Sequence, residues 1–250
     1  MTEELPQLYS RLADWFHLLT QPADYAEEAE FYRRAILSAS HITPRTLLEL
    51  GSGGGNNASH LKAHFDLTLV DISAQMLSVS RSINPECEHL LGDMRAVRLG
   101  RPFDAVFIHD AVSYLTTLAD LGLAMQTAWA HCRPGGVALF APDFIRETFR
   151  PSTSHGGHDG AERSMRYLEW TWDADASDTT YLADFAYLLR DETGATQVES
   201  DRHHLGLFSR SEWLDTMGQA GFQPRAIPFL HSKIEPGAAE VLLGLRPLER

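Results

Sequence analysis

Apolar residues at the start of the chain recur every three or four positions, the spacing that places side chains on one side of a helix. One series runs to residue 19 and a second follows Pro22; the positions are Leu5, Leu8, Leu12, Trp15, Phe16 and Leu19, then Tyr25, Ala29, Tyr32 and Ile36. We therefore expect two helices before residue 45.

Between residues 46 and 141, short apolar runs alternate with segments of helical spacing. The runs typical of strands are 46–50, 67–70, 87–91, 103–108 and 137–141, and the helical segments are 56–63, 74–81 and 118–131. This alternation predicts a parallel sheet with helices on both faces. Ligands of such sheets bind beyond the carboxyl ends of the strands. The polar residues at those ends are Glu49, Asp71, Asp93, His109, Asp110 and Asp143.

The pattern changes after residue 143. A segment rich in Ser, Gly and His at 151–159 is typical of a mobile loop, and runs of β character follow at 163–172, 181–190 and 196–205. In the middle run every second side chain is apolar, which predicts an antiparallel meander with one buried face; these residues are Tyr181, Ala183, Phe185, Tyr187 and Leu189. The meander is expected either to roof a ligand pocket or to form a dimer surface.

The last forty residues predict one helix and two strands. Ser209 is typical of a capped helix start, Gly221 of its end, and two apolar runs surround Gly237. We expect a single domain over residues 1–250 with four parts. They are a helical cap (1–44), a ligand-binding core (45–145), an inserted antiparallel sheet acting as a lid (146–208), and a C-terminal helix with the last two strands (209–250).

Composition points to an ordinary globular protein. The chain has 250 residues, 44% of them hydrophobic, which is enough for a sizeable core. It lacks the run of about 18 apolar residues that a membrane helix needs, and residues 1–6 lack the pattern of a signal peptide, so we expect a cytoplasmic protein. Cys87 and Cys132 have neither metal-ligand spacing nor the number that a disulfide framework needs, and both are expected to be reduced.

The charge of the chain argues against nucleic acid as a partner. The net charge is -13, and the only lysines are Lys62 and Lys233. Nucleic-acid binding draws most of its affinity from clustered Lys and Arg that contact phosphates. A small-molecule substrate fits better, and neither a nucleic-acid nor a membrane partner is expected.

A glycine-rich turn follows the first predicted strand in Glu49-Leu-Gly-Ser-Gly-Gly-Gly55. Glycines let the backbone approach a ligand closely, and the amides at the start of the next helix can face a pyrophosphate or a carboxylate. Gly53, Gly55 and Ala58 also fit the G-x-G-x-x-A pattern of dinucleotide-binding enzymes, so the turn alone leaves a nicotinamide-dependent oxidoreductase open.

Two further features narrow the ligand. Asp71 ends the second predicted strand, the position from which a carboxylate accepts hydrogen bonds from both ribose hydroxyls. One strand later, Gly92-Asp93-Met94 can place an acceptor near an adenine amino group and an apolar side chain against the ring. These features indicate a nucleoside.

Together these motifs resemble the class I S-adenosylmethionine-dependent methyltransferases. The matching features are Glu49 to Gly55, Asp71 with Ile72 and Met76, Gly92-Asp93-Met94, and Arg133-Pro-Gly-Gly136 before the fifth strand. Their order and spacing match over about residues 45–142. The resemblance implies a Rossmann-like α/β fold with a seven-stranded, mostly parallel sheet whose last strand is antiparallel, helices on both faces and, in this chain, the inserted meander.

The same resemblance implies the ligand and its contacts. The methyl donor would be S-adenosyl-L-methionine and the product S-adenosyl-L-homocysteine, with the aminoacyl part at the glycine turn in place of a pyrophosphate. The residues implied at the cofactor are Glu49, Gly51, Ser52, Gly53, Gly55, Asn56, Asp71, Ile72, Met76, Asp93, Met94, His109 and Tyr25.

A narrower similarity is to small-molecule N-methyltransferases that act on nucleotide-linked aminosugars. It rests on Asp24-Tyr-x-x-Glu28-Ala, Gly92-Asp-Met-Arg95, Arg98-Leu-Gly-Arg101 and Glu147-Thr-Phe149, while Asp143-Phe-Ile stands where these enzymes have an aromatic-rich stretch. This similarity implies N-methylation of an aminosugar-like small molecule.

Methyl transfer to an amine or hydroxyl requires alignment of the nucleophile and exclusion of water. A general base adds about 10²- to 10⁴-fold to the rate. His109 is the predicted base and Asp110 the competing one. Tyr9 and Tyr114, with Asp143, are the predicted substrate contacts; the tyrosine rings can face the sulfonium charge or pack in the core.

Three questions stay open at this point. The histidines His155, His158, His203 and His204 lack a recognisable metal-ligand spacing, and no metal is expected. Besides the oxidoreductase, a cofactor-binding regulatory protein without catalysis is an alternative function. Whether the protein forms a homodimer is left open.

Overall fold

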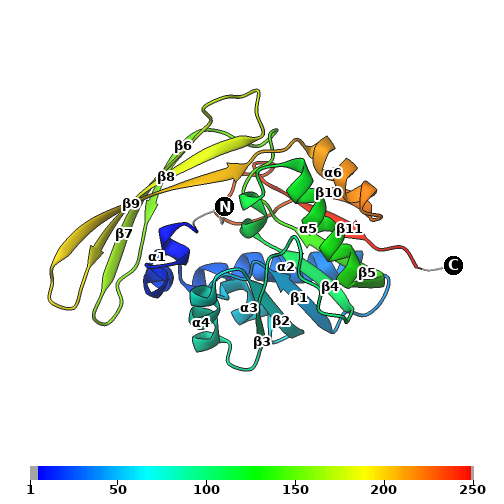
Figure 1. Ribbon diagram of the computed structural model, residues 1–250, viewed down its shortest axis with the longest axis horizontal. Coiled ribbons are helices and arrows are strands. Elements are labelled where there is room, and N and C mark those ends of the chain that lie inside the picture. Colours follow the sequence, from blue (N-terminus) through cyan, green and yellow to red (C-terminus); the bar gives the residue numbers. More distant parts are fainter. Residues whose placement is uncertain (1–4, 249–250) are drawn as a thin grey trace.

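The computed structural model describes residues 5–248 and contains a seven-stranded and a four-stranded sheet (Figure 1). Residues 1–4 and 249–250, the ends of the predicted cap and C-terminal segment, lie outside the described residues. The seven-stranded sheet has the order β10-β11-β5-β4-β1-β2-β3. Strand β11 alone runs against the others, since it pairs antiparallel with both β5 and β10. The predicted seven-stranded α/β fold, with its last strand antiparallel, is confirmed.

Most strands lie close to the predicted ranges, but β5 begins at Cys132 and not at the predicted residue 137, so the Arg133-Pro-Gly-Gly136 motif lies inside this strand and not before it. The strand bounds are β1 Thr46–Leu50, β2 Asp66–Asp71, β3 Glu88–Leu91, β4 Phe103–Ile108, β5 Cys132–Phe140, β10 Gln223–Pro228 and β11 Glu240–Leu245. Every residue of β4 is buried, as expected for a central strand with both faces covered. The crossover from β1 to β2 brings the carboxyl ends of these strands to one edge of the sheet.

Helices cover both faces of this sheet, and alternate residues of each strand point to opposite faces. Helices α5 (Leu118–His131) and α6 (Arg210–Gln219) pack on one face against Leu48, Val106 and Phe140. Helices α2 (Ala26–Ala39) and α3 (Asn56–Leu61) pack on the other against Leu47 and Phe107. Helix α4 (Ala74–Ile83) follows β2, and the turn η4 (Asp110–Tyr114) follows β4.

The first predicted helix is wrong. The segment forms the short turns η1 (Gln7–Tyr9) and η2 (Ala13–Trp15), a four-residue α1 (Phe16–Leu19) and the turn η3 (Pro22–Tyr25). Its apolar residues do not form one continuous helix face, because Leu8 and Leu12 pack on Met165, Tyr187 and Leu189 of the inserted sheet. Packing against a partner sheet therefore overrides the local helical spacing.

The inserted sheet has the order β6-β7-β8-β9 and stands beside the seven-stranded sheet, with α1 next to it (Figure 1). Its strands are β6 Ser152–Gly156, β7 Ser164–Trp172, β8 Thr180–Arg190 and β9 Thr196–Gly206. The alternation predicted for β8 is confirmed, since Tyr181, Ala183, Tyr187 and Leu189 are all at most 1% exposed. The mobile loop predicted at 151–159 is wrong for its first half, because residues 152–156 pair with β7 as an edge strand.

Within residues 5–248, no helix has both the length and the apolarity to cross a bilayer. Cys87 and Cys132 are free thiols, as predicted.

Candidate active site

The glycine turn uses most of its own amides internally. The N–H groups of Gly51 and Ser52 donate to the Val70 carbonyl at 2.7 and 3.0 Å, and Gly53 donates to the Asp71 carboxylate at 2.8 Å. Gly55 donates to the Ser52 carbonyl at 3.0 Å. These four N–H groups are therefore not available to a ligand, because β2 and the turn itself already accept their hydrogen bonds.

Side chains around the turn are instead left without partners. Glu49 Oε2, Ser52 Oγ and both polar atoms of the Asn56 amide are buried with no hydrogen bond, and His17 and Tyr25 lie beside Asn56. Buried polar atoms are nearly always hydrogen-bonded in native proteins, so such a group of unpartnered atoms is typical of a ligand site.

Glycine occupies positions 51 and 53 for two different reasons. Gly51 has φ +71° and a Cβ there would lie 2.4 Å from Ala111 Cβ, so its backbone packs closely on η4. Gly53 has φ +52°, and a Cβ at this position would meet no atom within 4 Å. The turn thus leaves open space at Gly53, beside the unpartnered polar side chains, where an aminoacyl group fits.

Asp71 lies where a ribose-binding carboxylate is predicted. It is 8% exposed at the end of β2, and its two oxygens accept from Gly53 N–H and Ser73 N–H, both at 2.8 Å. Burial raises the pKa of Asp71, while these backbone donors oppose the shift. Each carboxylate oxygen has a further lone pair, so both can still accept from a sugar hydroxyl.

Apolar side chains at the ends of β2 and β3 lie beside Asp71. Ile72 is 52% exposed and Leu91 is 65% exposed, whereas Met76, on α4, is buried. Exposed apolar side chains next to a buried carboxylate suit the flat ring of a nucleobase. Sequence reasoning missed Leu91, although it is the final residue of a predicted strand. Met76 supports the site from below and has little surface to offer a ligand.

Asp93 is held by its neighbour Arg95. The Arg95 guanidinium contacts both Asp93 oxygens, at 2.7 to 3.1 Å, and reaches Asp120 at 3.1 Å. Burial alone would raise the pKa of Asp93, but the Arg95 hydrogen bonds lower it. Met94 approaches Gly51, which places it between the turn and this acid. The contact between Asp93 and an adenine amino group stays a prediction. In that contact the Asp93 carboxylate would accept hydrogen bonds from both Arg95 and the adenine.

His109 lies between two carboxylates at the end of β4. Its Nε2 is 3.4 Å from Glu28 Oε1, and its Nδ1 is 3.3 Å from Asp110 Oδ1. Burial acts to lower the pKa of His109, but Asp110 and Glu28 outweigh it and raise the value to about 10. The ring is therefore an imidazolium at neutral pH. Glu28, on α2, was part of a predicted motif but was not predicted as a site residue.

Asp110 and Asp143 interact through their charges, and both side chains are accessible to solvent. The Asp110 side chain is 48% exposed, and Asp143 is also exposed. Desolvation by the surrounding protein atoms, followed by the negative charge of Asp110, raises the pKa of Asp143 to about 7. Its backbone N–H donates to Ser113 Oγ at 3.2 Å, and Tyr181 contacts its carboxylate at 3.5 Å. An accessible carboxyl group with this pKa can exchange a proton near neutral pH.

Aromatic rings surround the same carboxylates. Tyr25 meets the His109 ring edge to face at 6.1 Å, and Tyr9 meets Tyr114 edge to face at 5.7 Å. Burial, followed by the charge of Asp110, raises the pKa of Tyr9 and of Tyr25. The structure therefore brings the predicted tyrosines together with His109, Asp110 and Asp143 at one end of the sheet.

The charge of the site distinguishes between the candidate ligands. Five carboxyl groups converge here, and burial raises the pKa of Glu49 among them to about 8; the five are Glu28, Glu49, Asp71, Asp110 and Asp143. A dinucleotide would bring a pyrophosphate with two negative charges into this field, whereas S-adenosylmethionine has two cationic groups, the sulfonium and the α-ammonium, against one carboxylate. Because buried charges need partners of opposite sign, the site fits S-adenosylmethionine and not a nicotinamide dinucleotide.

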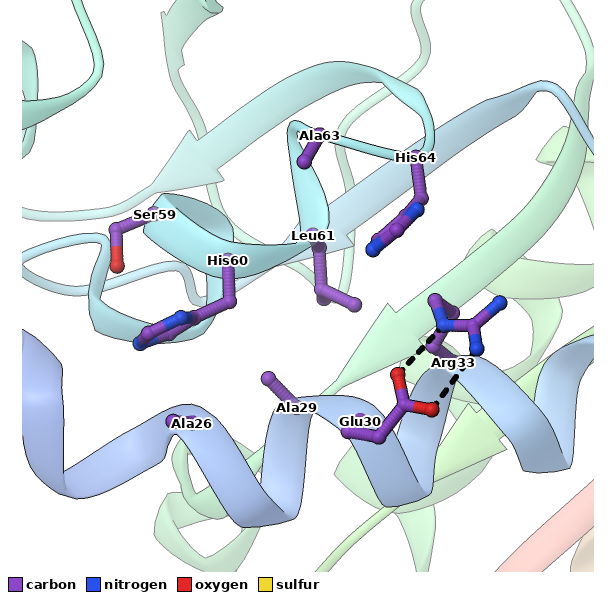
Figure 2. A pocket seen from close by; sticks show the side chains of 9 residues that line it. All are labelled: Ala26, Ala29, Glu30, Arg33, Ser59, His60, Leu61, Ala63 and His64. Atoms are coloured by element: carbon purple, nitrogen blue, oxygen red, sulfur yellow. Dashed lines mark hydrogen bonds and ion pairs between the residues drawn. The ribbon is translucent and has the colours of Figure 1, made fainter.

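Other polar clusters lie elsewhere. A groove of about 330 Å³ between α2 and α3, where Glu30 pairs with Arg33, contains none of the predicted site residues (Figure 2). Of the adjacent histidines on β9, His203 is 3% exposed and His204 is exposed, as expected for opposite faces. Among residues 5–248, no three His, Cys, Asp or Glu side chains are arranged to hold a metal ion.

Comparisons with known proteins agree with this geometry. A family model described as a methyltransferase domain matches residues 47–136. The chain is 36% identical over 130 residues to dTDP-3-amino-3,4,6-trideoxy-alpha-D-glucopyranose N,N-dimethyltransferase of Streptomyces venezuelae, covering 50% of this chain and 54% of the relative. It is 27% identical to dTDP-3-amino-3,6-dideoxy-alpha-D-glucopyranose N,N-dimethyltransferase of Streptomyces fradiae, covering 73% and 72%. The first alignment thus spans about half of that relative.

Among solved structures, DesVI of Streptomyces venezuelae superposes with a TM-score of 0.80 at 26% identity, over 96% of this chain and 98% of that one. The sheet order, the glycine turn and the strand-end carboxylates define a class I S-adenosylmethionine-dependent methyltransferase. The methyltransferase family model covers residues 47–136 of this chain, and the chain as a whole is similar to the aminosugar N-methyltransferases in sequence and fold. S-adenosylmethionine is the cofactor of the family, and the residues of the turn fit it.

Replacing Asp71 tests the ribose contact. Charge-assisted hydrogen bonds contribute about 1.5–3 kcal/mol, so we expect Asp71→Ala to weaken S-adenosylhomocysteine binding about 10-fold or more in titration calorimetry. Asp71→Asn keeps acceptors for the turn amides and should lose less affinity. Asp66→Asn, at the exposed start of the same strand, is the matched control and should bind like the parent. Binding by Asp71→Ala within twofold of the parent would contradict the assignment.

Proposed function

We propose that the protein transfers a methyl group from S-adenosylmethionine to the amine nitrogen of a small, aminosugar-like molecule. The relatives named above are N,N-dimethyltransferases of dTDP-linked amino-dideoxy and amino-trideoxy sugars. The observation that carries the proposal is the pair of accessible carboxylates, Asp110 and Asp143, at the carboxyl ends of the sheet. Carboxylates attract an ammonium group and can take its proton.

The chain itself has three tasks in this reaction. S-adenosylmethionine, when bound, supplies a methyl group already activated by a sulfonium. The protein has to orient the amine, exclude water and remove a proton, because only an uncharged amine has a lone pair to form the new C–N bond. We assign orientation to Tyr9 and Tyr114 and proton removal to Asp143.

His109, the base predicted from sequence, receives a different part in this proposal. As an imidazolium between Glu28 and Asp110 it has no free nitrogen to accept a proton. We propose that it holds these two carboxylates in place, and that Asp110 raises the proton affinity of Asp143 through its charge.

The remaining expectations belong to the same proposal. We propose that the protein is cytoplasmic, has no nucleic-acid partner and works as a single domain with four parts. These features fit a small-molecule enzyme with a net charge of -13. A cofactor-binding regulator without catalysis would have no need of carboxylates that can exchange a proton beside the nucleoside site.

A panel of acceptors tests the substrate class. We expect primary and secondary amines on nucleotide-linked 3-amino and 4-amino sugars to gain methyl groups, measured by mass spectrometry of the product and by release of S-adenosylhomocysteine. The matching sugars with a hydroxyl in place of the amine are the controls and should stay unmodified. Methylation of the hydroxyl sugars alone would refute an amine acceptor.

The pH dependence tests Asp143. Since the pKa of Asp143 is about 7, the fraction of carboxylate falls as pH drops below 7, and kcat at saturating substrates should fall with it and level off above pH 8. Asp143→Asn should lower kcat by about 10²- to 10⁴-fold and remove the acidic limb of the pH profile, that is, the fall of kcat below pH 7. Asp215→Asn, an exposed acid on α6, should leave the profile unchanged. The idea fails if Asp143→Asn keeps both the limb and a third of the parental kcat.

We also propose that two copies associate through the outer face of the inserted sheet. Four large apolar side chains are exposed on this one face, which is unusual for a monomer surface; they are Leu168 at 50%, Trp170 at 53%, Leu188 at 45% and Val198 at 70%. Leu188 and Val198 are paired across β8 and β9, and the register of β7 with β8 places Leu168 and Trp170 on the same face of the sheet.

Sedimentation velocity tests this association. The parent should sediment at about twice the mass of the 27.9 kDa chain, and Leu188→Glu should shift it to the monomer. Leu37→Glu replaces an equally exposed leucine on α2 and should leave the dimer intact. A parent protein that sediments as a monomer at all accessible concentrations would rule out the dimer.

A further inference from the structure

A chain of four polar side chains connects the inserted sheet to the predicted methyl-transfer site. The hydroxyl oxygens of Tyr9 and Tyr114 are 3.0 Å apart, and the Tyr114 hydroxyl is 2.7 Å from Nδ1 of His203. Nε2 of His203 faces Asp201 Oδ2 at 3.4 Å. Three separate parts of the chain therefore meet here, namely η1, η4 and β9.

The Asp201 end fixes the segment that carries Tyr9. Asp201 Oδ2 accepts hydrogen bonds from the backbone N–H of Gln7 at 2.7 Å and of Leu8 at 3.4 Å. These two residues directly precede Tyr9. The backbone of Tyr9 is held as well, since its carbonyl accepts from Ser73 Oγ at 2.6 Å. The inserted sheet thus positions both the main chain and, through His203 and Tyr114, the hydroxyl of Tyr9.

The middle of the chain is a buried aromatic cluster. His203 is 3% exposed and packs at 4.7 Å on Phe185, with Tyr9 and Tyr114 at 5.9 and 5.8 Å between ring centroids. A phenol carries one proton, so Tyr114 donates to one neighbour and accepts from the other. Loss of His203 Nδ1 would leave the Tyr114 hydroxyl with one partner missing, so the Tyr9 hydroxyl would be held by a Tyr114 side chain that is itself less constrained. The contacts of the Tyr9 backbone with Ser73 and of Gln7 with Asp201 would remain.

The Tyr9 end lies within the electrostatic field of the reaction site. Burial raises the pKa of Tyr9 and Tyr114, and Asp110 and Asp143 each add to the effect on both. Both tyrosines are therefore neutral phenols at any pH at which the protein works. A neutral hydroxyl beside two carboxylates can make an oriented contact with a cationic group without bearing a charge itself.

We propose that His203 is a positioning residue for the transfer reaction, acting through Tyr114 to hold the Tyr9 ring and hydroxyl against the cationic end of the cofactor. Asp201 orients the His203 ring and ties down the Gln7–Leu8 backbone. The inserted sheet is then part of the catalytic apparatus as well as a cover. This inference rests on the proposed methyl transfer, and it concerns residues on β9 that lie outside the family-matched segment 47–136.

The decisive experiment is a double-mutant cycle between His203 and Tyr9. The probe is sinefungin, a cofactor analogue with an ammonium group where S-adenosylmethionine has its methyl sulfonium, and the readout is Kd from calorimetry. Because sinefungin binding needs no acceptor, this readout is independent of the proposed substrate. The variants are His203→Leu, Tyr9→Phe and the double variant, with kcat measured on the best acceptor of the panel as a second readout.

Two further variants control for general damage. His203→Asn keeps a hydrogen-bonding group near the Nδ1 position and should restore most of the function. His204→Leu alters the neighbouring, exposed histidine on the opposite face of β9 and should behave as the parent. Urea unfolding of each variant shows that the protein measured is folded.

The proposal expects His203→Leu and Tyr9→Phe each to weaken sinefungin about 10-fold, and the double variant to bind no more weakly than Tyr9→Phe alone. His203→Asn should stay within about threefold of the parent, and kcat should follow the same order. The proposal is overturned if the effects of His203→Leu and Tyr9→Phe multiply, if His203→Leu changes Kd less than twofold, or if His203→Asn is as impaired as His203→Leu. A failed acceptor panel with an intact cycle would instead refute only the proposed substrate.

Discussion

The structure depends on a concentration of carboxyl groups at one end of the seven-stranded sheet. Glu49 is the residue before the end of β1, Asp71 ends β2, Asp110 follows β4, and Glu28 reaches the same place from α2. Burying negative charge is costly unless a positive charge is placed beside it. The protein supplies the imidazolium of His109, protonation neutralises most of Glu49, whose pKa is about 8, and a cationic ligand balances the carboxylates that remain charged. This constraint selects an S-adenosyl cofactor over a pyrophosphate in a turn whose glycines alone allow either.

The same constraint explains why the site is built from distant parts of the chain. The parallel strands bring Glu49, Asp71 and Asp110 to one edge, but an edge alone does not exclude water. The short turns of residues 7–25 and the inner face of the inserted sheet lie over that edge, and they pack on each other through Leu8, Leu12 and Tyr187. Covering the site and positioning Tyr9 are consequently achieved by one set of contacts.

Much of this could be predicted from sequence, because some signals are local. Strands β1 and β4 and helix α5 occur at the predicted residues, since a buried apolar run or a capped amphipathic segment fixes its own limits. Gly51 of the glycine turn and Asp71 lie twenty positions apart, a separation set by the intervening helix and strand. The predicted positions of these two features at the strand ends match the structure.

What could not be predicted depends on contacts between distant segments. The helical spacing of residues 5–19 is broken up because Leu8 and Leu12 pack on a sheet more than 150 residues away. His109 looked like a base until Glu28 was placed 3.4 Å from its ring, and His203 gave no signal beyond its alternation with His204. Likewise, the glycine pattern gives no sign that β2 accepts the hydrogen bonds of the turn amides.

A crystal structure of the protein with S-adenosylhomocysteine is the most direct test of the central claim. The account predicts the homocysteine part in the open space at Gly53, near Glu49, Ser52 and Asn56, the ribose on Asp71 and the adenine between Ile72 and Leu91. Density for the nucleoside anywhere else, or a ribose without contact to Asp71, would contradict it.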